Sequence, residues 1–136
     1  MDVLSRRDIK EILEKWLKAW DEHDLDGVVE PFDEDVVFEH WTGAVIRGKN
    51  ELIAAWRRWF DEQSGFRFIK EDIFIDETDQ KALFRWIYEG PAFGRKHEGK
   101  KEVRRGVDLL YFRDGKIIEK SVYSKTSIEI DGKKSV

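Results

Sequence analysis

Residues 106–119 of the chain read GVDLLYFRDGKIIE, a strand-forming run followed by a polar turn and the start of another apolar run. Apolar and aromatic residues fill most positions as far as Phe112, which is typical of a buried β-strand. The next four residues, 113–116, are Arg-Asp-Gly-Lys, a polar connection of hairpin length. The stretch therefore predicts two neighbouring antiparallel strands, which we place near 101–112 and 116–127.

Asp108 is the one charged residue between Gly106 and Phe112. Because side chains alternate across a strand, Asp108 shares one face with Leu110 and Phe112, and apolar residues also fill the other face. An ionised carboxylate in such surroundings costs several kcal/mol unless it is paired, solvated inside a cavity, or protonated through a raised pKa. Asp108 is therefore either a structural ion pair or a functional acid in a pocket, and we favour the pocket.

The rest of the second half also alternates in the manner of strands, which we place near 66–76 and 81–89. Residues 77–80, Glu-Thr-Asp-Gln, join these two strands as a short polar turn, whereas residues 90–94, Gly-Pro-Ala-Phe-Gly, form a longer connection. The second half is therefore expected to be an antiparallel meander. The polar residues 128–136 are expected to fray.

The first half carries helical periodicity instead. Ser5 and Asp8 resemble a capping box, and apolar residues then recur at spacings of three and four as far as about residue 22. The members of this stripe are Ile9, Ile12, Leu13, Trp16 and Trp20. Asp24 can cap a second, short helix, which Pro31 limits.

A strand and a third helix complete the first half. Residues 36–41, Val-Val-Phe-Glu-His-Trp, read as a strand, and residues 42–48 as a loop or a short second strand. Asn50 is a suitable cap for a third amphipathic helix. Helices in the first half and strands in the second predict an α+β fold, in which helices cover one face of a curved antiparallel sheet. We expect residues 1–136 to form a single domain.

Composition excludes several classes of site and partner. The chain has no cysteine, which excludes disulfides, thiol nucleophiles and thiolate metal sites. Its 25 basic and 29 acidic residues are interspersed, so there is no electrostatic footprint for nucleic acid. Three scattered histidines predict no metal site. The start of the chain does not resemble a signal peptide and no apolar run is long enough for a bilayer, so we expect a cytoplasmic protein without a membrane partner.

Four segments carry a resemblance to a known family. They are WLKAWDEHDLDG at residues 16–27, FDEDVVFE at 32–39, the glycine at 48 before a helix, and FRDGKIIE at 112–119. In this order and spacing they resemble the SnoaL-like branch of the nuclear transport factor 2-like superfamily. The resemblance implies a cone of about three N-terminal helices packed on a strongly curved antiparallel or mixed sheet, around one deep apolar pocket. Members include ketosteroid isomerases, polyketide cyclases, epoxide hydrolases, dehydratases and domains without known activity, so the fold predicts a pocket more firmly than a reaction.

The resemblance also suggests roles for single residues. Asp108 matches the pocket aspartic acid with which ketosteroid isomerases donate a hydrogen bond to the developing oxyanion. His40 stands where that family carries its proton-abstracting aspartate and Trp16 where it carries the pocket tyrosine, so those two roles are not kept. Polyketide cyclases use a pocket aspartate as acid and base in an aldol closure, which Asp108 can match. For the Asp-Arg-Asp constellation of the epoxide hydrolases, Asp108 with Arg85 or Arg104 is a partial match.

His40 and Asp108 are the candidate catalytic pair. Apolar neighbours on the predicted strand lower the pKa of the His40 imidazole, which keeps it neutral and suits a general base. Asp108, if it lies across a cavity, can exchange a proton with it during enolisation, dehydration or ring closure. The alternative for His40 is a satisfied, half-buried side chain. A salt bridge from Arg85 or Arg104 would instead lower the pKa of Asp108 and make it a poor acid, and the sequence does not choose between these arginines.

Further residues are candidates for substrate binding. Trp16, Trp20 and Phe38 supply aromatic surface for a pocket wall, although tryptophans at helical spacing are also typical of a core. Arg85 and Arg104 are candidates for holding a polar end of the substrate. The last candidate is Tyr123, which can donate a hydrogen bond into a cavity or lie at a sheet edge or a dimer face.

These candidates predict a small-molecule pocket protein that works without a cofactor. We expect a lyase, isomerase or cyclase that transfers protons on a small apolar carbonyl or hydroxyl compound. The alternative is a non-catalytic module of the same fold that binds an apolar ligand or dimerises. A sheet that is apolar on both faces needs a cover for its outer face, so we expect a homodimer through that face.

Overall fold

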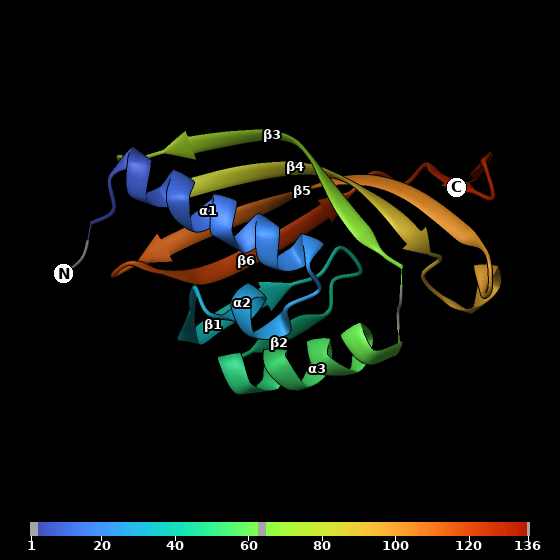
Figure 1. The fold of residues 1–136 in the computed structure, drawn as a ribbon, viewed down its shortest axis with the longest axis horizontal. Coiled ribbons are helices and arrows are strands. Elements are labelled where there is room, and N and C mark those ends of the chain that lie inside the picture. Colours follow the sequence, from blue (N-terminus) through green and yellow to red (C-terminus); the bar gives the residue numbers. More distant parts are fainter. Residues whose placement is uncertain (1–2, 63–64, 136) are drawn as a thin grey trace.

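The computed structural model describes residues 3–62 and 65–135. In this part of the chain the helices are α1 (Arg6–Asp21), α2 (Leu25–Val29), α3 (Lys49–Glu62) and the short 3₁₀ helix η1 (Arg95–His97). The strands are β1 (Phe32–Glu39), β2 (Val45–Arg47), β3 (Arg67–Asp76), β4 (Lys81–Pro91), β5 (Lys101–Arg113), β6 (Lys116–Ser124), β7 (Ile128–Ile130) and β8 (Lys133–Ser135). The expected α+β class is confirmed (Figure 1).

The strands form one mixed sheet in the order β2-β1-β6-β5-β4-β3. The meander from β3 to β6 is antiparallel, as expected, whereas β1 pairs with β6 in parallel. Helix α1 packs against β3, α3 packs against β1 and β2, and α2 contacts both of these helices. Figure 1 shows α1 along one side of the bent sheet and α3 near β1 and β2. None of the helices described in the structure is long and apolar enough to cross a membrane.

The predicted helix starts are confirmed for α1 and α2. The Asp8 backbone N–H donates to Ser5 Oγ at 3.1 Å and the Ser5 N–H donates to Asp8 Oδ2 at 3.1 Å, which completes a capping box. Asp24 caps α2 by accepting the Gly27 N–H at 3.2 Å. The predicted cap at Asn50 is wrong: α3 already begins at Lys49, after Gly48 with a φ of +92°.

The turn between β5 and β6 is a two-residue hairpin. Asp114 and Gly115 have φ values of 50° and 80°, and both therefore lie in the left-handed region that a type I′ turn requires. Asp and Gly are among the residues that adopt left-handed φ values most readily. The Asp-Gly pair of the predicted turn therefore suits a type I′ hairpin.

A β-bulge follows this turn and decides which residues of β6 face inward. Phe112 pairs with Ile117, but Tyr111 pairs with Glu119, so Ile118 is an extra residue on β6. An extra residue reverses the inside-outside alternation of everything beyond it.

The reversal changes the neighbours of Asp108. In a regular hairpin Asp108 would pair with Ser121, and Tyr123 would share its face. With the bulge Asp108 pairs with Val122, and Lys120 and Val122 take the inner face while Tyr123 turns outward.

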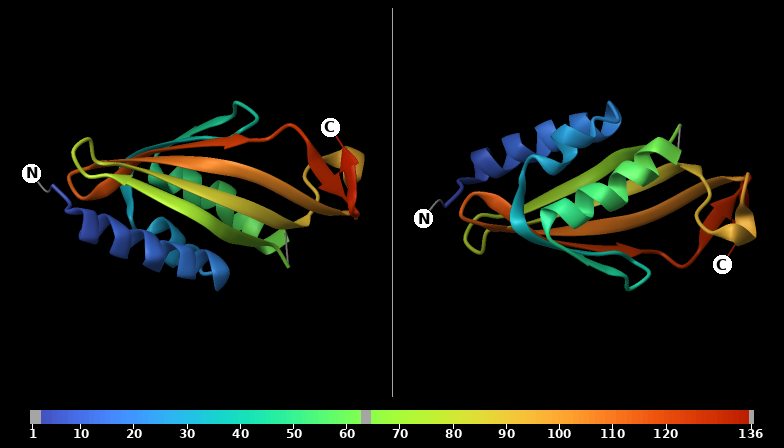
Figure 2. Two further views of the ribbon diagram at one scale, coloured as in Figure 1. Left: turned by 90° about the horizontal axis from the view of Figure 1, so that it is seen from above. Right: turned by 90° about the horizontal axis from the view of Figure 1, so that it is seen from below.

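Residues 128–135 do not fray as predicted, and position 136 lies outside the described residues. Strands β7 and β8 form a hairpin that lies at the end of the sheet opposite the N-terminus (Figure 2). Ile128 and Ile130 are buried, and Ile130 pairs with Glu102 of β5. Most residues of this segment are polar, but Ile128, Glu129 and Ile130 alternate in the manner of a strand. The two isoleucines therefore share one face, which the hairpin buries.

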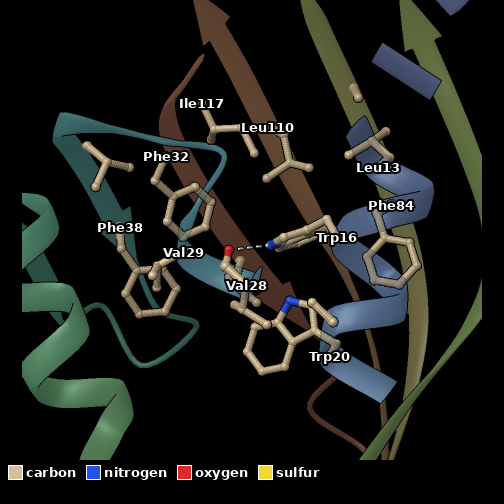
Figure 3. Close-up of a cluster of buried hydrophobic side chains, with 14 of the residues drawn as sticks. Leu13, Trp16, Trp20, Val28, Val29, Phe32, Phe38, Phe84, Leu110 and Ile117 are labelled. Atoms are coloured by element: carbon tan, nitrogen blue, oxygen red, sulfur yellow. Dashed lines mark hydrogen bonds between the residues drawn. The ribbon is translucent and has the colours of Figure 1, made fainter. Parts of the chain in front are cut away.

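One continuous core lies between the helices and the inner face of the sheet (Figure 3). Trp16 of α1 is at its centre, where its ring packs edge-on against Phe32 and Phe84. The Trp16 Nε1–H donates to the Val28 carbonyl at 3.0 Å, which satisfies the one polar atom of this side chain.

Candidate active site

A cavity of about 340 Å³ opens beside this core. The residues that line it come from α1, α3, six strands and two connections, and they are Trp20, Phe38, His40, Trp41, Thr42, Ala44, Ile46, Trp56, Trp59, Phe68, Phe84, Trp86, Phe93, Asp108, Lys120 and Val122. Nine of these are Trp or Phe, so the cavity favours an apolar ligand, and its volume is at the small end for ligand pockets.

Asp108 reaches the cavity from β5 and is almost completely buried, with 7% of its side chain exposed. Trp86 Nε1–H donates to its Oδ1 at 2.9 Å, and Lys120 Nζ lies 3.5 Å from its Oδ2. Burial raises the pKa of the Asp108 carboxyl, and the Lys120 charge and the Trp86 hydrogen bond oppose this rise. The alternative of an ion pair named Arg85 or Arg104 as the partner of this carboxylate, but the cation beside it is Lys120.

Gly106 makes the contact between Trp86 and Asp108 possible. It pairs with Trp86 across β4 and β5, and a Cβ atom at this position would lie only 2.5 Å from the Trp86 ring. The indole therefore lies over the glycine and extends toward the carboxylate two residues further along β5.

Lys120 lines the cavity although it is not among the residues predicted from the sequence. Its side chain is 7% exposed, and its ammonium lies between 4.9 and 5.7 Å from the ring centres of four residues, Trp16, Trp20, Phe38 and Trp56. Burial lowers the pKa of Lys120, and the Asp108 charge opposes this effect. One signal was present in the sequence, because Lys120 alternates with the apolar residues Ile118 and Val122.

His40 directly follows β1 and lines the cavity. Its pKa is lowered to about 4, chiefly by burial and further by the charges of Lys120 and Arg104, as the sequence predicted for an apolar site. The Thr42 backbone N–H donates to His40 Nδ1 at 3.3 Å. Because an amide can only donate, this contact leaves the proton of the neutral ring on Nε2. The imidazole is therefore a weak base and a suitable hydrogen-bond donor.

The state of His40 can be measured by its pH dependence. Its folded pKa of about 4 lies below the ordinary 6.5, so the unfolded chain binds more protons in this window and the free energy of unfolding rises with pH through it. We expect the ring protons of His40 to titrate near pH 4 in an NMR experiment, with the signal identified by its loss in His40→Gln. A midpoint near 6.5 would contradict the buried, neutral ring.

Arg85 and Tyr123 do not reach the cavity, contrary to prediction. Arg85 lies on the outer face of β4, 52% exposed, where it pairs with Asp72 at 3.0 Å and Glu71 at 3.7 Å. Tyr123 lies on the outer face of β6, 53% exposed, because of the bulge at Ile118. Neither side chain can contact a ligand held beside Asp108.

Trp16 and Arg104 also differ from their predicted places. Trp16 belongs to the core and is not part of the cavity wall. Arg104 pairs with the fully buried Glu102 at 2.7 Å and does not contact Asp108. Its guanidinium stacks over Trp41 at 4.7 Å and lies 5.7 Å from Phe93, and both rings line the cavity. Arg104 therefore contributes to the cavity indirectly, by packing against two of the rings that form its wall.

Of the eight predicted site residues, the structure brings four to the cavity: Asp108, His40, Trp20 and Phe38. A further polar atom of the wall is Trp59 Nε1, which is buried without a hydrogen-bond partner among the described residues. No group of three or more His, Asp or Glu side chains that could hold a metal occurs in the described part of the chain. The candidate chemistry thus lies in a carboxyl, an amine and an imidazole at an aromatic cavity.

The family described as SnoaL-like domain matches residues 13–120 of this chain. An NTF2-like protein of unknown function from Mesorhizobium loti is 26% identical, with a TM-score of 0.69 over 88% of this chain and 92% of that one. A protein from Xanthomonas campestris, proposed to be a polyketide cyclase, is 15% identical, with a TM-score of 0.77 over 88% of this chain and 92% of that one.

SalBIII, an epoxide hydrolase/cyclase-like enzyme of pyran ring formation in the polyether salinomycin, has the same fold. It is 16% identical, with a TM-score of 0.75 over 90% of this chain and 94% of that one. No curated protein sequence matches the chain significantly. At these identities the solved structures show that the chain has their fold.

Proposed function

The chain belongs to the family of SnoaL-like domains, and on this basis we propose that its cavity binds a small apolar carbonyl compound and catalyses proton transfer on it. The reaction class is that of a cofactor-independent isomerase, lyase or cyclase. Enolisation, dehydration and aldol ring closure share one step, the removal of a proton next to a carbonyl group, and the proposal concerns this step.

One observation carries the proposal: the Asp108 carboxyl is held at the wall of an apolar cavity with a raised pKa. A carboxylate with a raised pKa is a stronger base than one in water, and its protonated form is an acid that remains available nearer neutral pH. Asp108 is thus suited to remove a proton from a substrate carbon and to return it elsewhere on the same molecule.

His40 fits the role of an electrophile better than the role of a general base. Its neutral ring carries the proton on Nε2, and a pKa of about 4 makes it a poor acceptor at neutral pH. A neutral imidazole donor can stabilise the negative charge that develops on a carbonyl oxygen when the neighbouring carbon loses its proton. Asp108 then acts as the base and His40 as the donor to the oxygen.

The solved structures with this fold are consistent with such chemistry. Those named above include SalBIII, which is epoxide hydrolase/cyclase-like, and the Xanthomonas campestris protein, proposed to be a polyketide cyclase. At 15% and 16% identity these structures show a shared fold and not a shared reaction. The proposal therefore depends on Asp108 and its surroundings.

A non-catalytic binding module is the second candidate, and one observation favours it. Asp108 already has partners for both of its oxygens, Trp86 and Lys120. A fully satisfied pair can serve to organise the cavity around a ligand without reacting with it. The two functions differ in one measurable property, because only the enzyme accelerates exchange of the protons next to the carbonyl.

The test uses benzylacetone, an apolar ketone, in deuterated water. Five of the six tryptophans line the cavity, so binding is expected to change their fluorescence. If the protein is an enzyme of the proposed class, NMR will show incorporation of deuterium next to the carbonyl at a rate above that in buffer. Binding without faster exchange would support the binding module. Native mass spectrometry of the purified protein would identify a co-purified ligand of the same chemical class.

We also propose that two copies pair through the outer face of the sheet. Phe74 of β3 is 62% exposed there, and Leu83 and Leu109 follow it in the same cross-strand row. A two-fold dimer would bury this row. Light scattering on a sizing column is expected to give twice the chain mass for the natural protein, and a lower mass for Phe74→Lys. A monomeric natural protein would contradict the dimer.

A further inference from the structure

Lys120 is the one reactive group at the cavity that the proposed function has not used. It is the only amine that lines the cavity within the described residues, and aromatic rings surround its side chain. A lysine placed in this way has two possible uses, as a fixed positive charge or as a nucleophile. Its contact with Asp108 favours the nucleophile, because the neighbouring carboxylate can take up the proton that the amine must lose.

We propose that Lys120 is a nucleophile that forms a covalent imine with an aldehyde or ketone bound in the cavity, with Asp108 as the acid and base beside it. The inference rests on the proposed function, because it requires a carbonyl compound in the cavity. It narrows the substrates to aldehydes and ketones, since esters, amides and epoxides do not form imines with an amine.

The geometry supplies the two groups that imine formation needs. The amine must lose its proton to attack the carbonyl carbon, and an acid must then protonate the hydroxyl group that leaves as water. Asp108 Oδ2 lies 3.5 Å from Lys120 Nζ and can perform both tasks. Trp86 fixes the carboxyl through its other oxygen at 2.9 Å, so Oδ2 remains directed toward the amine.

Burial favours the required protonation states. It lowers the pKa of Lys120 and raises the pKa of Asp108, and both changes bring the ion pair closer in energy to the neutral amine and carboxylic acid. Transfer of a single proton from Nζ to Oδ2 therefore produces the nucleophile and the acid together.

The reaction can be written with every atom accounted for. The neutral amine attacks the carbonyl carbon and forms a C–N bond, and the nitrogen proton moves to the former carbonyl oxygen to give a carbinolamine. Asp108 then gives its proton to that hydroxyl, the C–O bond breaks, and water and a positively charged iminium remain. The regenerated carboxylate can remove a proton from the neighbouring carbon, which gives an enamine. Addition of water reverses these steps and releases Lys120.

The aromatic rings around Lys120 fit this sequence of charges. The centres of the Trp56 and Phe38 rings lie 4.9 and 5.0 Å from Nζ, within the range in which a ring attracts a cation. An iminium on Lys120 carries its positive charge at the same place as the ammonium it replaces. The rings and the Asp108 carboxylate therefore stabilise the covalent intermediate as well as the free lysine.

The experiment traps the imine with sodium cyanoborohydride, which reduces an iminium faster than the ketone itself. The natural protein is incubated with benzylacetone and the reductant, and peptide mapping by mass spectrometry locates the adduct. We expect one adduct on Lys120, none at that site in Lys120→Arg, and an unchanged Lys120 adduct in Lys116→Arg. Lys116 is a matched control, because it lies at the exposed start of the same strand.

Each outcome decides between the two proposals. If benzylacetone changes the tryptophan fluorescence and exchanges its protons, but Lys120 of the natural protein stays unlabelled, the imine is overturned and the proposed function stands. Exchange that continues in Lys120→Arg at the natural rate would likewise overturn it, because the variant has no amine at this position that can form the imine. An adduct on Lys120 without proton exchange would support the imine and overturn the proposed function. A protein that neither binds nor reacts with the ketone would overturn both.

Discussion

Asp108→Asn is expected to lower the rate of proton exchange on bound benzylacetone by about 10²- to 10⁴-fold, the usual contribution of a general acid or base. The amide cannot take up a proton from the substrate carbon. Its oxygen can still accept the Trp86 Nε1–H, which lies 2.9 Å from the carboxyl oxygen it replaces. The Trp86 contact is therefore kept, and the affinity for the ketone, measured by tryptophan fluorescence, is expected to change little. The Lys120 ammonium loses its carboxylate partner, so the variant is also expected to unfold at a lower urea concentration.

A matched control is available on the other side of the sheet. Asp72→Asn removes a carboxylate that pairs with Arg85 at the outer face, so the exchange rate should be unchanged. If Asp108→Asn instead loses affinity in proportion to activity, the carboxylate serves to bind the ligand, and the binding module becomes the better description.

Lys120→Met is expected to lower the free energy of unfolding by about 3–5 kcal/mol at pH 7, the usual result of removing one partner from a buried ion pair. The variant leaves the Asp108 carboxylate buried opposite a methionine. The double variant Lys120→Met with Asp108→Asn removes the stranded charge and keeps the acceptor for Trp86, so most of the loss should be recovered. Urea denaturation of the natural protein and these variants measures the coupling between the two sites.

The same variant has a predictable pH dependence. Without Lys120, burial raises the folded pKa of Asp108 above its ordinary 3.8 with less opposition. The native state then binds the carboxyl proton more tightly than the unfolded chain does, so the destabilisation should be smallest below pH 3.8 and grow as the pH rises through the folded pKa. A difference between variant and natural protein that is constant from acid to neutral pH would mean that the carboxylate is not confined by burial.

Local sequence signals predicted most of the elements correctly. Ser5 and Asp8 form the predicted capping box, and Asp114 with Gly115 forms the predicted tight turn. Such features depend on residues that are close in sequence, so their chemistry can be recognised without the fold. The position of Asp108 at the cavity was also recognisable, because this residue interrupts an apolar strand in which an unpaired charge would be costly.

Features that depend on pairing between strands were harder to predict. A single extra residue, Ile118, reverses the alternation of β6, and this reversal placed Tyr123 outside and Lys120 inside. Arg85 was a candidate for substrate binding and one of two possible partners of Asp108, but it lies on the outer face of β4, where it pairs with Glu71 and Asp72 of β3. Alternation shows which residues of one strand share a face. The pairing with the neighbouring strand decides whether that face is the inner or the outer face of the sheet.

The bulge at Ile118 makes the chemistry of this cavity depend on how β6 accommodates one extra residue. If Ile118 instead paired regularly with Tyr111, every later residue of β6 would slip by one, and Ser121 and Tyr123 would take the face that now carries Lys120 and Val122. The amine would leave the interior and two hydroxyl groups would enter it, without any change of side chain at those four positions. A change that removes the bulge without shortening β6 would therefore replace one set of reactive groups with another through a shift of register alone.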